Sequence, residues 1–296
     1  MNIAVILTCF NRKQQTLSCL KSLFEARDNY SPKIDLHIYL TDDGCTDGTA
    51  DAVRESFPSE NITILQGDGN LFWAGGMRFA WKEALKRHSE WDFYLLLNDD
   101  TNVIEGCFQE LLKTHNYCLN FYQRSGLYSG ITCSVDAPHR LTYGGDVWVN
   151  KFWGTMRRLD RSDKPQRCDL TNANILLVPS DVVDKIGIFY HKYIHGSADS
   201  DYSHYANTHG IPVLVTAEYC GKCDDDHPDR EEQQRIVCSL SLKERKKYFN
   251  NPINSSKDYL IYRSRVTPFR YPMVFLGRVL NLYFPKLYYK LEKRRW

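Results

Sequence analysis

Apolar residues at the start of the chain change from a continuous run to a helical spacing. Residues 3–7 are all apolar, as expected of a strand that is buried on both faces of a parallel sheet. Apolar side chains then recur at helical intervals, at Leu17, Leu20, Leu23 and Phe24. This pattern predicts a strand, a loop and a helix in this order.

The same alternation continues as far as residue 97. Further strands are expected at residues 34–40, 62–65 and 91–97, and helices at residues 50–57 and 75–86. Strands that alternate with helices predict an α/β fold with an open, mostly parallel sheet flanked by helices. Ligands bind such sheets at the C-terminal ends of the strands, so the residues that follow each strand are the first candidates for function.

The pattern becomes mixed beyond residue 130. A strand at residues 175–178 and a helix that starts near residues 179–181 are expected. The polar run 224–234 predicts a mobile loop.

Charge divides the chain into two parts. Residues 1–240 hold 24 Lys and Arg against 33 Asp and Glu, whereas residues 241–296 hold 14 against 3. We therefore expect a main domain over residues 1–240 and a basic, helical C-terminal region over residues 241–296, where prolines interrupt the helices. Its ten aromatic residues between Tyr259 and Trp296 favour an anionic membrane surface as its partner. No nucleic-acid-binding motif accompanies the charge, so no nucleic acid partner is expected.

Composition and termini predict a cytoplasmic location. With 43% hydrophobic and 25% charged residues the chain can bury a large core. The first apolar run has no basic residues before it and ends at Asn11 and Arg12, so it predicts neither a signal peptide nor a membrane span. The ten scattered cysteines favour free thiols in a reducing compartment. We expect a cytoplasmic protein at the inner face of the plasma membrane.

Acidic residues follow two of the predicted strands. Asn98, Asp99 and Asp100 come directly after an apolar strand, where carboxylates need solvent or a cation. Mg²⁺ or Mn²⁺ bridging a diphosphate would satisfy them, and capping of the next segment is the alternative. Asp42 ends another strand at the same edge of the sheet and could accept a hydrogen bond from a nucleobase.

The order of these motifs resembles glycosyltransferase family 2. The matching residues are Thr8 to Leu23, which read Thr-x-Asn-Arg and Leu-x-x-Cys-Leu-x-Ser-Leu, and Asp42 to Thr49, which read Asp-Asp-Gly-x-Thr-Asp-Gly-Thr. The resemblance implies the GT-A fold, with a C-terminal helical extension in this chain. It also implies that the donor base is held by Asp42 and by the loop after the first strand, with Thr8, Phe10, Asn11 and Arg12.

The resemblance implies that two more segments bind the donor. Asn98-Asp99-Asp100 is similar to the family's Asp-x-Asp motif, so Asp100 is the expected ligand of Mn²⁺ or Mg²⁺, and Asn98 and Asp99 are expected to contact the donor. Residues 67–77 resemble a glycine-rich segment of rhamnosyl- and galactofuranosyltransferases, which implies donor contacts from Asn70, Gly75 and Gly76. An ordinary loop before a helix is the alternative for this segment.

The catalytic base is expected near residue 200. Inverting sugar transfer needs a base that removes a proton from the acceptor hydroxyl. By resemblance Asp199 aligns with the family's base and Asp201 with its second acidic position, although Ala198 replaces the usual Glu. The alternative for Asp199 is the N-cap of a helix that runs to residues 209–210.

The half of the chain beyond residue 130 is expected to build the acceptor side. Trp148 and Trp153 are candidates for stacking on an acceptor sugar ring, with core packing as the alternative for each of them.

The resemblance also implies a histidine as a further metal ligand, and His227 has the expected position. Cys220 and Cys223 could instead begin a zinc site, but no second well-spaced pair of ligands completes it.

These expectations define an inverting, metal-dependent glycosyltransferase. Its donor is a nucleoside-diphosphate sugar, with dTDP-rhamnose or a UDP-sugar favoured, and its acceptor is a hydroxyl of a glycan or lipid-linked glycan in bacterial surface polysaccharide synthesis, such as O-antigen. One alternative is a sugar nucleotidyltransferase, which usually needs a glycine-rich phosphate loop that residues 8–12 lack. The other is a non-catalytic glycan- or membrane-binding protein with the same fold.

Overall fold

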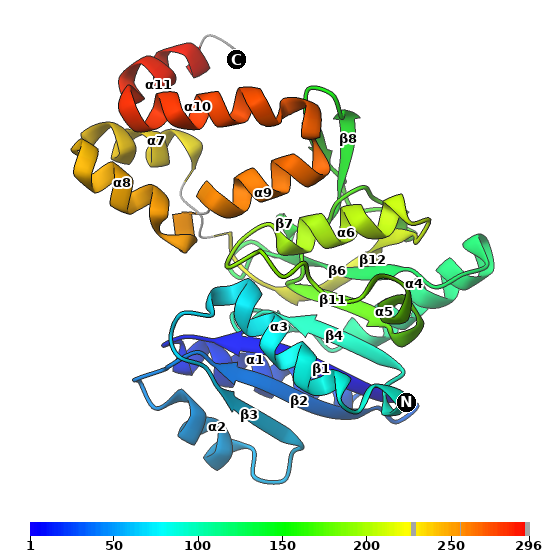
Figure 1. Cartoon of the computed structure of the whole chain (residues 1–296). Helices are drawn as coiled ribbons and strands as arrows, with labels where there is room; N and C mark the ends of the chain where they lie inside the picture. The colour runs from blue at the N-terminus through cyan, green and yellow to red at the C-terminus, as the bar shows by residue number, and fades with distance from the viewer. Residues whose placement is uncertain (226–228, 255, 294–296) are drawn as a thin grey trace.

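A single large sheet organises the molecule (Figure 1). The computed structural model describes residues 1–225, 229–254 and 256–293. Four neighbouring strands are parallel, in the order β3-β2-β1-β4. Their bounds are β1 Asn2–Cys9, β2 Asp35–Asp42, β3 Ile62–Gln66 and β4 Phe93–Leu97. Their C-terminal ends therefore meet at one edge, as the sequence predicted.

The second half of the sheet is mixed. β11 (Ile175–Pro179) lies antiparallel between β4 and β6 (Leu127–Cys133), and β12 (Val213–Lys222) is parallel to β6. Three short strands complete this half, β5 (Asn102–Val103), β7 (Leu141–Tyr143) and β10 (Gln166–Arg167). A separate hairpin is formed by β8 (Asp146–Asn150) and β9 (Thr155–Arg158).

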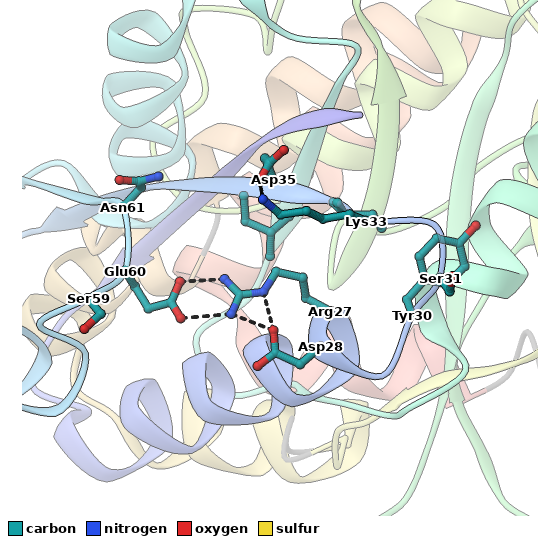
Figure 2. A pocket seen from close by; sticks show the side chains of 11 residues that line it. Arg27, Asp28, Tyr30, Ser31, Lys33, Asp35, Ser59, Glu60 and Asn61 are labelled. Carbon is teal, nitrogen blue, oxygen red and sulfur yellow. Dashed lines mark hydrogen bonds and ion pairs between the residues drawn. The ribbon is translucent and has the colours of Figure 1, made fainter.

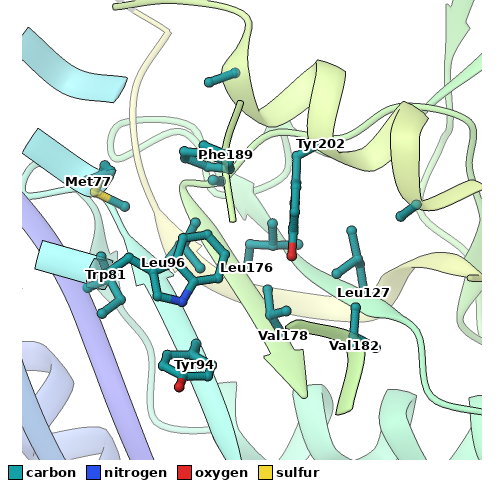
Figure 3. Close-up of a cluster of buried hydrophobic side chains, with 14 of the residues drawn as sticks. Met77, Trp81, Tyr94, Leu96, Leu127, Leu176, Val178, Val182, Phe189 and Tyr202 are labelled. Carbon is teal, nitrogen blue, oxygen red and sulfur yellow. The ribbon is translucent and has the colours of Figure 1, made fainter. Parts of the chain in front are cut away.

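Helices cover both faces of the sheet because the strands are apolar on both. On β1, Ile3, Val5 and Leu7 pack into the cluster under α1 (Lys13–Asp28), α2 (Thr49–Ser56) and α4 (Cys107–Tyr122). Ala4 and Ile6 pack on the other face, beneath α3 (Phe72–Leu85), α5 (Ser180–Ile186) and α6 (Ala198–Thr208). Figure 3 shows this second cluster, where Trp81 lies among buried side chains of β4, β11 and α6.

The predicted α/β order is confirmed for the first 97 residues, with boundaries that differ by a few positions. α3 begins at Phe72, three residues before the helix expected at residue 75. The predicted loop at residues 224–234 is wrong in its second part, because α7 (Arg230–Ser239) starts there. The side chain of Asp229 caps this helix by accepting the N–H of Glu232 at 2.7 Å.

The C-terminal helices pack beside the second half of the sheet (Figure 1). They are α8 (Leu242–Asn250), α9 (Ser256–Val266), α10 (Tyr271–Tyr283) and α11 (Pro285–Lys293). α7 joins them, since Gln234 and Asn281 exchange buried hydrogen bonds of 2.8 and 3.0 Å. α9 packs against α6, which carries the predicted base. In the parts of the chain that are described, no helix has the length and apolar character needed to cross a membrane.

Candidate active site

The loops after β1 and β2 are joined at the C-terminal edge of the sheet. Asp42 ends β2 opposite Cys9 of β1, and its Oδ1 accepts the N–H of Cys45 at 2.7 Å. Asn11 has a positive φ of 52°, and its Oδ1 accepts the N–H of Thr46 at 2.7 Å. This side-chain bond stabilises a conformation that asparagine tolerates better than most residues. Beside it Phe10 is 54% exposed, so its ring is open to a ligand.

Asp43, which is no candidate on sequence grounds, holds the third loop of this edge. Its buried carboxylate accepts backbone N–H groups from Gly69 at 3.0 Å, Leu71 at 3.3 Å and Phe72 at 2.8 Å. The loop before α3 is thereby fixed to the end of β2, and it presents an exposed Asn70. Residues 67–71, the candidate donor loop, and the start of α3 thus depend on one carboxylate.

Close packing on the sheet requires a glycine at position 76, beside the expected donor role of Gly75 and Gly76. Both are buried within α3. A Cβ on Gly76 would lie 2.8 Å from the Cβ of Thr8 in β1, and the carbonyl of Gly76 accepts the hydroxyl of Thr41 at 2.9 Å. Glycine is required here because α3 approaches the sheet closely. Thr8 is itself buried in this contact.

The acidic triplet after β4 has three different environments. Asn98 Oδ1 accepts the indole N–H of Trp73 at 2.8 Å. Arg12 Nη1 lies 3.3 Å from Asp99 Oδ1 and 2.6 Å from Asp100 Oδ2. Asp99 is only 6% exposed, and burial raises its pKa to about 7, although the charge of Arg12 opposes this shift. Asp100 carries the more accessible carboxylate of the pair, because its side chain is 34% exposed.

A divalent cation fits the oxygen chemistry of this triplet only in part. Asp99 and Asp100 supply hard oxygen atoms, which suit Mn²⁺ or Mg²⁺. However, Asp100 Oδ2 is paired with Arg12, so a cation that binds this oxygen has to displace the guanidinium. No group of three metal-binding side chains is found in residues 1–225, 229–254 and 256–293. His227, the expected further ligand, lies outside the described residues.

The two candidate zinc ligands have separate surroundings. The Sγ of Cys223 lies 3.8 Å from Asp100 Oδ1 and 3.4 Å from the amide nitrogen of Asn174. The Sγ of Cys220 instead lies near the hydroxyl of Thr216, at 3.6 Å. All ten cysteines are free thiols, as expected from their scatter.

Asp199 is connected to the acidic triplet through the segment that enters β11. Its Oδ2 accepts the N–H of Ala173 at 3.2 Å, and the carbonyl of the next residue, Asn174, accepts the N–H of Asn98 at 3.1 Å. Burial raises the pKa of the Asp199 carboxyl, while its backbone hydrogen bonds lower it. The N-cap alternative is wrong, because Ser197 occupies that position with a φ of 65° and Asp199 lies in the first turn of α6.

Asp201 and the two tryptophans lie in different settings. Asp201 is 3% exposed, and its carboxylate accepts the Nε of Arg265 at 2.8 Å, so it is engaged in an ion pair. Trp148 is partly buried against the core, as the core-packing alternative stated. Trp153 lies beyond β8 in the hairpin turn and is 57% exposed. Trp153 is therefore the more exposed of the two tryptophans.

A hollow of about 590 Å³ lies away from these residues (Figure 2). It is lined by the end of α1 and the start of β2, which is the opposite end of the parallel strands. Arg27 forms two hydrogen bonds with Glu60 there, at 2.5 and 2.9 Å, and also pairs with Asp28. These charges satisfy one another, so this hollow adds nothing to the candidate site.

The fold and the carboxylates at the strand ends define a GT-A type α/β protein, and solved structures agree. The S. aureus protein TarS, residues 1–349, matches with a TM-score of 0.53 and 14% identity over 95% of this chain and 72% of that chain. Its complex with UDP-GlcNAc matches with a TM-score of 0.52 and 13% identity, over 95% and 73%. A mannosyltransferase from Pyrobaculum calidifontis, in complex with GDP-Man and Mn²⁺, matches with a TM-score of 0.50 and 15% identity, over 98% and 82%. At these identities the likeness establishes the fold.

A family model matches the first part of the sequence. Residues 4–128 match the model of glycosyl transferase family 2. This part of the chain holds the parallel strands and the acidic triplet and is similar to that family, while the rest of the chain lies outside the match. No curated protein matches the chain.

Proposed function

We propose that this protein is an inverting glycosyltransferase that transfers a sugar from a nucleoside diphosphate to a hydroxyl of a glycan or lipid-linked glycan. The observation that carries the proposal is the backbone path from Asp199 through Ala173 and Asn174 to Asn98. This path connects the Asp199 carboxylate, which is suited to accept a proton, to the acidic triplet, which is suited to bind a metal ion with a diphosphate. The donor favoured by sequence is dTDP-rhamnose or a UDP-sugar, for bacterial surface polysaccharide synthesis such as O-antigen.

Each part of the site has a task in this mechanism. The exposed ring of Phe10 and the carboxylate of Asp42 lie where the donor base is expected. Asp100, with His227 as a further candidate, would hold Mn²⁺ or Mg²⁺, which neutralises the charge that develops on the leaving diphosphate. Asp199 accepts the proton of the acceptor hydroxyl as that oxygen bonds to the anomeric carbon from the face opposite the diphosphate. Inversion follows from this single displacement.

A donor screen tests the proposal directly. Purified protein is incubated with UDP-, dTDP- and GDP-sugars and Mn²⁺, and the release of nucleoside diphosphate is measured. We expect one donor class to be consumed, and the matching nucleoside diphosphate with Mn²⁺ to raise the unfolding temperature, because a ligand that binds the folded state stabilises it. Absence of both effects for every nucleotide with Mn²⁺ and with Mg²⁺ would contradict the proposal.

The screen also separates the alternatives. A sugar nucleotidyltransferase would consume a nucleoside triphosphate together with a sugar phosphate and release pyrophosphate. A non-catalytic binding protein would be stabilised by nucleotide without turnover of any donor. The loop from Thr8 to Arg12 contains no glycine, which favours transfer over nucleotidyl chemistry.

The acceptor side has a surface suited to an anionic membrane. Three aromatic side chains lie at this surface. Phe152 and Trp153 of the hairpin turn are 59% and 57% exposed, and Phe269 of the short helix η3 (Pro268–Arg270) is 83% exposed. The rings of Phe152 and Phe269 are 6.4 Å apart, so two distant segments form one patch. Figure 1 shows the hairpin beside the bend between α9 and α10. The excess of 14 basic over 3 acidic residues in 241–296 complements anionic headgroups.

Vesicle binding tests this surface. We expect the protein to sediment with vesicles that contain phosphatidylglycerol more than with pure phosphatidylcholine, and Phe269→Ser to reduce this binding severalfold. Phe121→Ser is the matched control, because Phe121 is a phenylalanine that is 66% exposed on α4. Equal binding of the wild type to both kinds of vesicle, or equal losses in the two variants, would contradict the membrane assignment.

A further inference from the structure

A carboxylate of the C-terminal region binds the loop that precedes the candidate base. Asp258 of α9 is 2% exposed. It accepts three consecutive backbone N–H groups, from Ile194 at 3.1 Å, His195 at 2.6 Å and Gly196 at 3.1 Å. Three N–H groups that converge on one carboxylate fix the path of a loop more firmly than a surface ion pair does.

The same helix binds the segment just after the candidate base. Arg265 lies seven residues beyond Asp258, which places both on one face of α9. Its Nε donates to Asp201 at 2.8 Å, and its guanidinium lies 3.9 Å from the ring centre of Tyr190. α9 therefore contacts the chain on both sides of Asp199.

The loop 194–196 also contacts the donor side. The carbonyl of Ile194 accepts the N–H of Gly75 at 3.2 Å, and the rings of His195 and Phe72 meet edge to face at 6.3 Å. Phe72 in turn donates its N–H to Asp43. The loop thus lies between α9 and the start of α3, and it joins the donor loop to the segment that carries Asp199.

We propose that α9 is a positioning element of the active site, in which Asp258 and Arg265 hold Asp199 in its catalytic orientation. This inference rests on the proposed function, because it takes Asp199 to be the base. A displacement of about 1 Å of a catalytic group can cost about 100-fold in rate. The basic C-terminal region would then have two roles, positioning of the catalytic base and binding to a membrane.

Asp258→Asn tests the role of the buried carboxylate. The asparagine side chain has the shape of the aspartate side chain but only one acceptor oxygen. Its NH2 group would face the backbone N–H groups of residues 194–196, which are donors as well. We expect kcat for release of nucleoside diphosphate from the donor found in the screen to fall by about 10- to 100-fold, with an unchanged donor KM and unchanged affinity for UDP with Mn²⁺. Amide hydrogen exchange at residues 194–196 should become faster in the same variant.

Two further variants make the test specific. Glu292→Gln is the matched control, because it removes a charge from the same region, where Glu292 pairs with Arg230 far from the loop. It should change neither kcat nor the exchange at residues 194–196. Arg265→Lys keeps the positive charge but loses the planar donor, and a several-fold loss in kcat is expected. If Asp258→Asn does not fold, the kcat of Arg265→Lys tests the inference on its own.

The possible outcomes separate the inference from the proposed function. If the wild type turns over a donor and Asp258→Asn keeps kcat within about twofold, the inference is overturned while the function stands. A loss of UDP affinity that parallels the loss of kcat would also overturn the inference. An element that only positions the base should leave nucleotide binding unchanged. If the wild type turns over no donor, the proposed function fails, and unchanged exchange at residues 194–196 would overturn the structural link independently.

Discussion

Asp199→Asn is expected to lower kcat by about 10²- to 10⁴-fold, the range for loss of a general base. The asparagine keeps the acceptor oxygen that can bind the N–H of Ala173 or of Ser200, so the fold of this segment should persist. Affinity for UDP with Mn²⁺ should stay unchanged, because the hydrogen bonds of Asp199 go to these backbone groups and not to the acidic triplet. Steady-state turnover and nucleotide titration measure the two quantities.

The matched control for this variant is Asp181→Asn. Asp181 lies on α5, where its exposed carboxylate pairs with Lys185 on the surface at 3.1 Å. Its loss should change kcat by less than about twofold, since exposed ion pairs contribute little. A loss below about tenfold in Asp199→Asn would assign the proton transfer to another group. Asp201 would be the next candidate, although its ion pair with Arg265 lowers its availability.

The pH dependence provides a second signature of Asp199. Burial raises the pKa of this carboxyl above its ordinary value. A base acts only when it is ionised, so kcat/KM should rise with pH through this raised pKa and fall off on the acid side. The rising limb should therefore lie above the range of an ordinary aspartate, which is about pH 4. In Asp199→Asn this limb should disappear, leaving a flat residual rate over the same pH range.

The sequence predicted the sheet well because its signals are local. Apolar runs followed by helical spacing identify strands and helices within windows of some ten residues, and the order of elements then requires a parallel sheet. The same reasoning placed Asp42 and Asp100 at one edge. It did not predict α4, whose buried face of Phe108, Leu111 and Cys118 is interrupted by polar residues. The polar run after β12 misled the prediction in the same way, because α7 is a largely exposed helix.

The contacts that organise the site were not predictable from local patterns. Arg12 and Asp100 are 88 positions apart, and Asp258 and His195 are 63 apart, so no spacing rule connects them. Asp43 adjoins Asp42 in the motif, and only the structure shows that Asp43 binds the candidate donor loop. Gly76 illustrates the converse, because a glycine in a functional motif was required for helix packing. Long-range contacts thus decide which residue of a motif supports structure and which faces a ligand.

Asp100→Asn is expected to remove most of the Mn²⁺-dependent part of nucleotide binding. The carboxylate is 34% exposed and lies at the edge where a diphosphate would bind. Loss of groups that merely support metal ligands costs about 10- to 100-fold in affinity, so loss of a ligand should cost at least about 100-fold. In thermal unfolding with UDP and Mn²⁺, the wild type at about 100 times its Kd gains about 2.7 kcal/mol. The variant should keep only the gain that UDP produces without metal.

The control is Glu105→Gln, which neutralises an exposed carboxylate five residues further along and should leave the Mn²⁺ effect intact. An unchanged Mn²⁺ effect in Asp100→Asn would show that other groups hold the cation. Arg12 provides the opposite test, because its guanidinium pairs with Asp100 Oδ2 at 2.6 Å and must leave before a cation can bind there. Arg12→Ala should therefore tighten Mn²⁺ binding in the absence of nucleotide, whereas Asp100→Asn should weaken it. Opposite effects of these two variants on Mn²⁺ binding would locate the cation at Asp100 Oδ2, the oxygen that pairs with Arg12.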